Sequence, residues 1–348
     1  PLLVGGQDFQ TITPMILTFA NNVSSRPLAA LLALFLGVAT IILLTIMIQI
    51  EKRGHYMSVS KVKTTIVKQK IRNPILNVLA HVYAYLLFLI YVIPVALVVL
   101  FSFTDSATIA SKHLTLSSFT LENYISIFQK ASSYKPFVVS IAYSAIAASF
   151  VAIIVLIACR ILQKRKDRLS GALEYGLLIP WLLPTTLMAL GLITTYNTPR
   201  VWMFNKVLTG TSVIMLIGYI IIKIPFTLRM TKAAFFSLDD SLEDAARNMG
   251  AKPFYTFMRV QLPIILPTVL AIFALNFNGL LGDYDMSVFM YHPLNKPLGV
   301  YIKSLTDSET NADNAALTFV YAVLMMIISG VVMYLVYGRG NKVDKSKD

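Results

Sequence analysis

The side chains that most often perform catalysis are scattered through this sequence of 348 residues. Its four histidines stand far from one another, and the single cysteine, Cys159, lies in an apolar run and excludes an internal disulfide. The sequence has neither a metal-binding spacing of histidine and cysteine nor a glycine-rich phosphate loop ending in Gly-Lys-Ser or Gly-Lys-Thr. We therefore predict no catalytic residues, no metal site and no cofactor bound by this chain.

Polar side chains within apolar stretches are the next candidates for chemistry, because burying them in hydrocarbon is costly. The segment from residue 266 to 293 carries Asn276, Asn278, Asp283 and Asp285. The two asparagines, two positions apart, point to different faces of a helix. We predict a translocation path with an outer gate that attracts a cation or a cationic protein. The alternative is hydrogen bonding between helices for the asparagines and a solvated loop for the aspartates.

Two other features interrupt apolar stretches. Lys223 stands six residues before Arg229, and we expect its long side chain to extend to the inner membrane interface rather than to bind a solute. Pro180 and Pro184 lie within one apolar segment, and they predict a kink or break there.

A charged stretch, SLEDAARNMGAKPFYTFMRVQLP, ends a polar loop at about residues 237–263. Acidic residues at its start favour the first turn of a helix, and Gly250 suits the left-handed turn that ends one. Pro253 can open a second helix, whose apolar residues recur on one face. We predict a helix, a glycine turn and an amphipathic helix at the membrane surface, with Pro263 beginning the next span. The alternative is a helix lying in the lipid headgroups.

The elements that position these residues are apolar helices. The sequence is 56% hydrophobic and only 14% charged, with a mean hydropathy of +0.69, which is typical of a polytopic α-helical membrane protein. Seven segments approach the ~20 residues that cross the hydrocarbon. They are residues 27–50, 77–103, 136–159, 173–196, 210–228, 264–286 and 316–337.

The positive residues predict the orientation. Of the 30 lysines and arginines, 21 fall in residues 51–76, 160–172, 229–262 and the C-terminal tail, all on one side of the spans. That side is therefore cytoplasmic, and the C-terminus lies in the cytoplasm. The net charge of +13 is explained by this topology, so we do not predict nucleic acid as a partner.

The arrangement of spans predicts two units, one of them truncated. We interpret residues 1–50 as the outer segment and last span of a first unit, and residues 51–76 as a basic cytoplasmic linker. Residues 77–340 form a complete six-span unit, and residues 341–348 form a cytoplasmic tail. The first and last spans share the spacing of an Ala-Ala-Leu run and an arginine, as a tandem repeat would.

The charged stretch resembles the EAA signature of binding-protein-dependent ABC transporter permeases. That signature reads E-A-A, three residues, G, nine residues and I-x-L-P. At the same spacing this sequence has Asp244-Ala245-Ala246, Gly250 and Val260-Gln261-Leu262-Pro263. Aspartate replaces glutamate and valine replaces isoleucine. Because Glu243 stands next to Asp244, either residue could be the acidic residue of the signature.

The resemblance implies an all-α polytopic protein with the type I ABC importer permease fold. It implies that the loop docks onto an ATPase through a defined set of residues. These are Glu243, Asp244, Ala245, Ala246, Gly250, Leu262 and Pro263. The implied partners are a cytoplasmic ABC ATPase dimer, which uses the ATP, an extracellular or periplasmic substrate-binding protein, and membrane lipid. The implied location is the plasma membrane of a bacterium, and the mechanism is alternating access.

The outer segments point to a cargo. The opening PLLVGGQDFQTITPMI and the run NFNGLLGDYDMSVFMYHPLNKPLGV resemble fused two-unit ferric-iron permeases, so we expect ferric iron. Related permeases for polyamines, phosphonates or thiamine are the alternative. An ion-coupled secondary transporter would need charges deep in several spans, and a membrane enzyme would need clustered catalytic side chains; the sequence favours neither.

Overall fold

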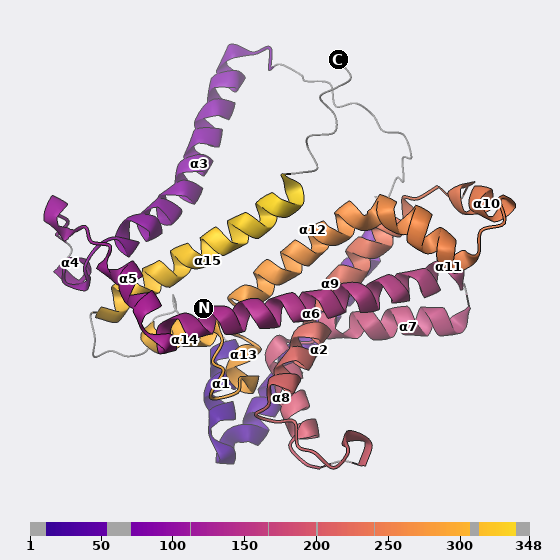
Figure 1. Ribbon diagram of the computed structural model, residues 1–348, viewed down its shortest axis with the longest axis horizontal. Coiled ribbons are helices and arrows are strands. Elements are labelled where there is room, and N and C mark those ends of the chain that lie inside the picture. The colour runs from indigo at the N-terminus through magenta and orange to yellow at the C-terminus, as the bar shows by residue number, and fades with distance from the viewer. Residues whose placement is uncertain are drawn as a thin grey trace. The chain divides into compact units, whose positions relative to one another are not determined.

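The computed structural model (Figure 1) describes residues 12–53, 71–111, 113–165, 167–199, 201–239, 241–306 and 313–338. Within these ranges the elements are helical, apart from isolated bridges that join Thr104 to Phe119 and His292 to Asn295. The predicted all-α class is confirmed. Most of the predicted linker, the first residues and the predicted tail lie outside the described residues.

Among the described residues, five of the seven predicted spans correspond to long apolar helices and a sixth, 173–196, corresponds to a bent pair, whereas the first, 27–50, corresponds only to a shorter apolar stretch. By length and composition, five helices of the described residues could cross a membrane, and a bent pair would make a sixth. They are α3 (Pro74–Ser102), α6 (Ala131–Lys164), α9 (Ser212–Phe236), the run Pro253–Leu281 that contains α12 (Leu262–Leu281), and α15 (Asp313–Tyr337). A shorter apolar stretch, Pro27–Leu43, lies in α2 (Arg26–Arg53). The chain is a multi-pass membrane protein.

The segment predicted as the span 173–196 is broken, as its prolines indicated. Helix α7 (Arg168–Leu178) runs into the short η3 (Ile179–Leu182), and the chain then bends by 108° into α8 (Thr185–Tyr196). Leu183 is extended because the proline that follows it disfavours helical backbone there.

The described residues fall into two compact units. One is drawn from Pro1–Leu44, Ser132–Lys303 and Ile327–Asp348, and the other from Thr45–Ala131 and Ser304–Met326. In the second unit, α3 is followed by α4 (Ser106–Ser111), η2 (Leu116–Ser118) and α5 (Glu122–Gln129). The Tyr124 hydroxyl lies 2.7 Å from Ser102 Oγ, which fastens α5 to the end of α3.

The core of the first unit forms around α9. Helix α9 packs along α12 (Leu262–Leu281) and also contacts α7, η3 and α8. One buried cluster joins α9 to α6 and α12 through Cys159, Leu228 and Ile265, among others. A second joins them to α13 (Ser287–Met290) through Tyr219, Leu280 and Met290. Cys159 is buried here, as an apolar residue would be.

Shorter helices complete this unit. Helix α1 (Ile12–Asn21) meets α2 through buried Ile16 and Ala29, with η1 (Val23–Ser25) between them. The remaining short elements are η4 (Val201–Met203) and α14 (Leu298–Thr306). The loop between α9 and α12 carries the predicted coupling residues, so it is the candidate functional site.

Candidate functional site: the loop between α9 and α12

The loop begins with the helix that the sequence predicted. Helix α10 (Ser241–Asn248) ends in a turn in which Gly250 N–H donates to Arg247 O at 2.9 Å and Ala251 N–H donates to Ala246 O at 3.0 Å. Gly250 has φ +83°, the left-handed conformation that a glycine accepts without steric cost. The predicted glycine turn is confirmed.

The second half of the loop differs from the prediction of a separate surface helix. Helix α11 (Pro253–Thr256) continues through the π-helical turn η5 (Phe257–Gln261) directly into α12. The reason lies at Pro263, which has no N–H for a helical hydrogen bond and whose ring needs room. The wider π turn just before it, in which Leu262 N–H donates to Phe257 O, accommodates the proline without ending the helix.

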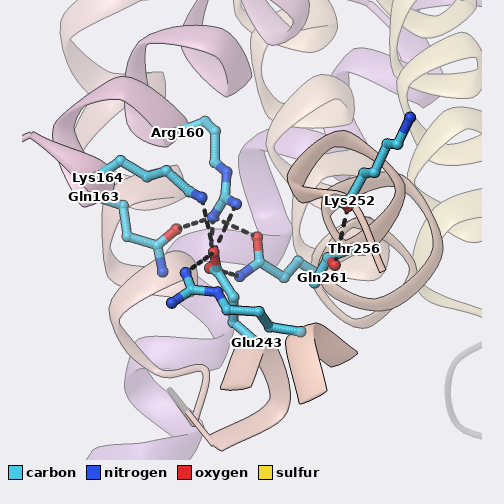
Figure 2. Close-up of polar contacts among 8 residues, drawn as sticks. Arg160, Gln163, Lys164, Glu243, Lys252, Thr256 and Gln261 are labelled. Carbon is cyan, nitrogen blue, oxygen red and sulfur yellow. Dashed lines mark hydrogen bonds and ion pairs between the residues drawn. The ribbon is translucent and has the colours of Figure 1, made fainter. Parts of the chain in front are cut away.

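The carboxylate of Glu243 is the centre of a polar cluster at the loop (Figure 2). Its Oε2 accepts from Arg160 Nη1 at 3.0 Å and from Gln261 Nε2 at 3.1 Å. Its Oε1 lies 2.8 Å from Lys164 Nζ and 3.2 Å from Arg160 Nη2. Arg160 and Lys164 lie on α6 and Gln261 ends η5, so one carboxylate joins three segments that are distant in sequence.

Arg160 makes further contacts within the cluster. Its Nη1 also donates to Gln261 Oε1 at 2.8 Å and to Gln163 Oε1 at 2.9 Å, and its guanidinium lies 5.7 Å from the centre of the Phe257 ring. The side chains of Arg160 and Glu243 are only 15% and 19% exposed. Two-point contact between a guanidinium and a carboxylate fixes orientation as well as distance. The cluster therefore holds α10 in one position against α6.

The same contacts set the charge of Glu243. The hydrogen bond from Arg160 is the largest influence, followed by the opposing cost of burial and the hydrogen bond from Lys164, and together they lower the pKa of Glu243 to about 2. Glu243 is therefore ionised throughout the physiological range of pH. Arg247, at 3.8 Å, adds a longer and more exposed ion pair to the same carboxylate.

The predicted coupling residues divide into inward and outward groups. Ala246 is 3% exposed and packs inward, and Leu262 is half-buried. Asp244, Ala245, Gly250 and Pro263 are exposed. The sequence left open whether Glu243 or Asp244 is the acidic residue of the motif. In the structure Glu243 contacts other parts of the protein, whereas Asp244 faces outward.

The exposed side of the loop carries large apolar side chains beside a hollow. Met249, Phe254 and Tyr255 are 82%, 74% and 59% exposed. A pocket of about 460 Å³ lies between α10 and α11, and Lys252 contributes to its wall. The full lining is Ala246, Met249, Gly250, Ala251, Lys252, Tyr255 and Val260. Large exposed apolar side chains around a concavity are typical of a protein contact surface.

The asparagines of the predicted path lie in different surroundings. Asn276 is 1% exposed, and its Nδ2 donates to Thr227 Oγ1 on α9 at 2.7 Å. Asn278 is half-buried, and its Oδ1 is buried without a hydrogen-bond partner among the described residues. The alternative of hydrogen bonding between helices therefore applies to Asn276.

The aspartates of the predicted path also differ from each other. Asp283 Oδ2 accepts from Ser287 Oγ at 2.8 Å and from the backbone N–H groups of Ser287 and Met286 at 3.1 and 3.3 Å. It thereby binds the start of α13 and is not part of a solvated loop. Asp285 is exposed. Within the described ranges, no three histidine, cysteine, aspartate or glutamate side chains gather closely enough to hold a metal ion.

Sequence reasoning missed the residues that complete the cluster. In the sequence, Arg160 and Lys164 stand out only as positive residues of a loop, and Gln261 is an unassigned position of the motif. Arg160 and Glu243 are 83 residues apart, so no local spacing could pair them. The available signal was an arginine and a lysine four positions apart at the end of a long apolar helix, which places both on one face.

Comparison with known proteins agrees with this geometry. The family model "Binding-protein-dependent transport system inner membrane component" matches residues 150–341. A probable ABC transporter permease protein, y4fN of Sinorhizobium fredii, is 36% identical over 337 residues, covering 96% of this chain. The chain spans 58% of that relative's length.

More distant relatives match shorter regions. A putative 2-aminoethylphosphonate transport system permease protein, PhnV of Salmonella paratyphi A, is 24% identical over 61% of this chain and 78% of its own length. An Fe(3+)-transport system permease protein, FbpB 2 of Haemophilus influenzae, is 30% identical over 36% of this chain and 24% of its own length.

A solved structure shares the fold. A chain of a bacterial ABC transporter involved in the import of the acidic polysaccharide alginate superimposes with a TM-score of 0.62 at 15% identity, covering 78% of this chain and 96% of that one. Together with the family match over residues 150–341 and the glycine turn at the predicted position, this confirms the resemblance. The chain belongs to the family of binding-protein-dependent transport system inner membrane components, the permeases of ABC transporters.

Proposed function

We propose that this chain is the membrane permease subunit of an ATP-driven importer, and that the loop between α9 and α12 transmits the work of a separate ATPase to the spans. The observation that carries this proposal is the Glu243 cluster beneath an exposed apolar surface. Such a loop offers a partner a contact surface, and Glu243 fixes it to α6 and to Gln261 of η5, which continues into α12. A force applied to α10 would therefore move both helices.

The proposed partners follow from this arrangement. A dimer of ABC ATPase subunits binds the exposed surface around Met249 and Tyr255, with the ATP bound by the ATPase and not by this chain. A substrate-binding protein delivers cargo to the opposite side. We place the protein in the plasma membrane of a bacterium with the loop and the C-terminus in the cytoplasm, because most lysines and arginines lie in the loops of that side.

Ferric iron is the proposed cargo. It is supported by the resemblance of the outer segments to ferric-iron permeases and by the similarity to the iron permease of Haemophilus influenzae. The similarity to a phosphonate permease extends over more of the chain. The domain division into an outer segment and span at 1–50, a linker at 51–76 and a six-span unit at 77–340 remains part of the proposal.

The experiment that tests the loop uses two matched substitutions in the full-length protein. Ala245→Glu adds a charge to an exposed position of α10, and Ala107→Glu adds the same charge to an exposed position of α4. We expect Ala245→Glu to abolish both co-purification with the ATPase and ATP-driven uptake of labelled ferric iron, and Ala107→Glu to retain both. Normal association and uptake by the Ala245→Glu protein would show that the loop has another role.

A further inference from the structure

The packed faces of α9 and α12 carry a line of polar side chains through the apolar interior. Tyr219, Lys223 and Thr227 follow one another at intervals of four residues on α9, so they share one face of the helix. The Tyr219 hydroxyl lies 2.6 Å from Ser287 Oγ, and Thr227 Oγ1 accepts from Asn276 Nδ2 at 2.7 Å. Tyr219 is thus paired with the start of α13 and Thr227 with α12.

Lys223 is the exception in this line. Among the described residues, its ammonium takes part in no hydrogen bond and no ion pair within 4.0 Å. Asp283 attracts it electrostatically, but the Oδ2 of that carboxylate already accepts three hydrogen bonds at the start of α13. The cation near the middle of the 25-residue α9 is therefore not neutralised by direct contact with an acid.

The ammonium lies beside Gly279 of α12. A Cβ atom built at Gly279 would stand 2.8 Å from Lys223 Nζ, so the missing side chain makes the space that the ammonium occupies. Lys223 precedes Thr227 along α9, and Gly279 follows Asn276 along α12. The contact of Lys223 with Gly279 therefore lies on the Tyr219 side of the hydrogen bond between Thr227 and Asn276. The side chain therefore does not extend past Thr227 toward Arg229, as the sequence suggested, and the interpretation of Lys223 as an interfacial lysine is wrong.

The surroundings of the ammonium are partly exposed. Lys223 is half-buried, whereas Gly279 and Leu275, one helical turn apart on α12, are exposed among the described residues. A charged group at the depth of a membrane span is costly unless it is paired or lines a water-filled path. A negatively charged solute that reaches Gly279 would supply the missing partner, with its oxygens accepting hydrogen bonds from the ammonium.

We propose that Lys223, seated over Gly279, binds a negatively charged, oxygen-rich group of the imported cargo. This inference rests on the proposed importer function and specifies its cargo class, namely an oxyanion or an anionic chelate. A free ferric ion would be repelled, whereas ferric iron in a chelate of net negative charge would be attracted. The site thus favours an anion, in contrast to the cation that the aspartates suggested.

The test measures binding independently of transport. The full-length protein is purified in detergent, and its unfolding midpoint is measured in sulfate, 2-aminoethylphosphonate or ferric citrate against chloride at matched ionic strength. A ligand that binds only the folded protein raises the midpoint. We expect at least one of the three anions to do so, and its identity distinguishes a free oxyanion from a metal chelate. No rise with any of them would overturn the proposal.

Variants of the site make the test specific. Lys223→Gln should weaken the apparent affinity about ten- to hundredfold, as the loss of a charged hydrogen bond would, and Lys223→Arg should retain most of it. Gly279→Ala displaces the flexible ammonium without removing its charge and should also weaken binding. Gly330→Ala is the matched control, because its added Cβ meets no described atom within 4 Å outside its own helix backbone and chain neighbours. An unchanged midpoint shift in Lys223→Gln would also overturn the proposal.

The outcome can be separated from that of the importer proposal. Association of the wild-type protein with the ATPase is a second readout and does not involve the anions. If the ATPase binds and no anion acts through Lys223, this inference alone fails. If an anion acts through Lys223 and no ATPase binds, the importer proposal fails and the anion site stands.

Discussion

The carboxylate of Glu243 on α10 lies 3.0 Å from the guanidinium of Arg160 on α6, although 83 residues separate them in sequence. Their contact is reinforced by Gln261, which bonds to both side chains from the π-helical turn. The exposed loop and two spans are thereby joined at one point. Because an Arg–carboxylate pair resists rotation as well as separation, α10 and α6 are expected to move as one body.

Removing the charge of Glu243 should loosen this connection. Glu243→Gln loses the charge-assisted hydrogen bonds to Arg160 and Lys164, and leaves their positive charges close together. We expect the free energy of unfolding to fall by about 1–2 kcal/mol, since the cluster is partly exposed to solvent. Urea unfolding of the detergent-purified protein, followed by tryptophan fluorescence or circular dichroism, measures this change.

The neighbouring aspartate is the matched control for that measurement. Asp244→Asn removes the same charge one residue later from an exposed position, so its effect on unfolding should stay within about 0.5 kcal/mol. Equal destabilisation by both substitutions would mean that the net charge of α10 matters and the contact with Arg160 does not. In an ATPase association assay, Asp244→Asn should be the more harmful of the two if the exposed carboxylate contacts the partner.

The stability of the folded protein should depend on pH through the carboxylate of Glu243. Its pKa is lowered to about 2 from an ordinary value of 4.5, so the unfolded chain takes up the proton more readily than the folded one. The contribution of Glu243 is therefore complete above about pH 5.5 and is lost as the pH falls from about 4.5 to about 2. The difference in unfolding midpoint between wild type and Glu243→Gln should therefore become smaller as the pH is lowered through this range.

Comparison with the variant is needed because other carboxylates act in the same direction. Hydrogen bonds from Thr108 lower the pKa of Asp105, and hydrogen bonds from Ser170 lower the pKa of Asp167. Both effects are present in wild type and in Glu243→Gln, so they cancel in the difference. A difference that stays constant from pH 7 to pH 3 would contradict the role assigned to the Glu243 carboxylate.

The sequence predicted those features that depend on local residue types. Apolar length predicted the spans, two prolines predicted the break between η3 and α8, and Gly250 predicted the left-handed turn. It did not predict that the helix after this turn continues into α12, because the π turn that accommodates Pro263 is a matter of hydrogen-bond register. Nor could it pair Glu243 with Arg160, because that contact depends on how α6 packs beside the loop.

The left-handed turn at Gly250 gives a prediction about backbone strain. Among the described residues, and apart from the neighbours of Gly250 in the chain, no atom lies within 4 Å of a Cβ added there. Gly250→Ala therefore costs only the positive φ of +83°, about 1–2 kcal/mol. The loop should relax that strain by shifting α10, and ATPase association should weaken. Thermal unfolding and co-purification with the ATPase report the two effects.

A substitution at a second glycine distinguishes the cost of backbone strain from the general effect of an added methyl group. Gly171 lies in α7, and an added Cβ there also meets no atom of the described residues within 4 Å outside its own helix backbone and chain neighbours. Its φ does not lie in the left-handed region. Gly171→Ala should therefore leave association unchanged and raise stability by about 0.5–1 kcal/mol, because alanine favours a helix. If Gly250→Ala is as well tolerated as Gly171→Ala, the turn does not require a glycine.

The two asparagines of α12 should respond differently to replacement by leucine. Asn276→Leu breaks the hydrogen bond to Thr227 and should cost about 0.6–2 kcal/mol, the range for such bonds between membrane helices. Asn278 Oδ1 is buried with no partner among the described residues, so Asn278→Leu should be neutral or stabilising. Uptake assays then give the functional answer: loss of transport in the stable Asn278→Leu protein would place that amide on the path of the cargo. Normal transport by Asn278→Leu, together with a loss in Asn276→Leu that follows its stability, would assign both residues to packing alone.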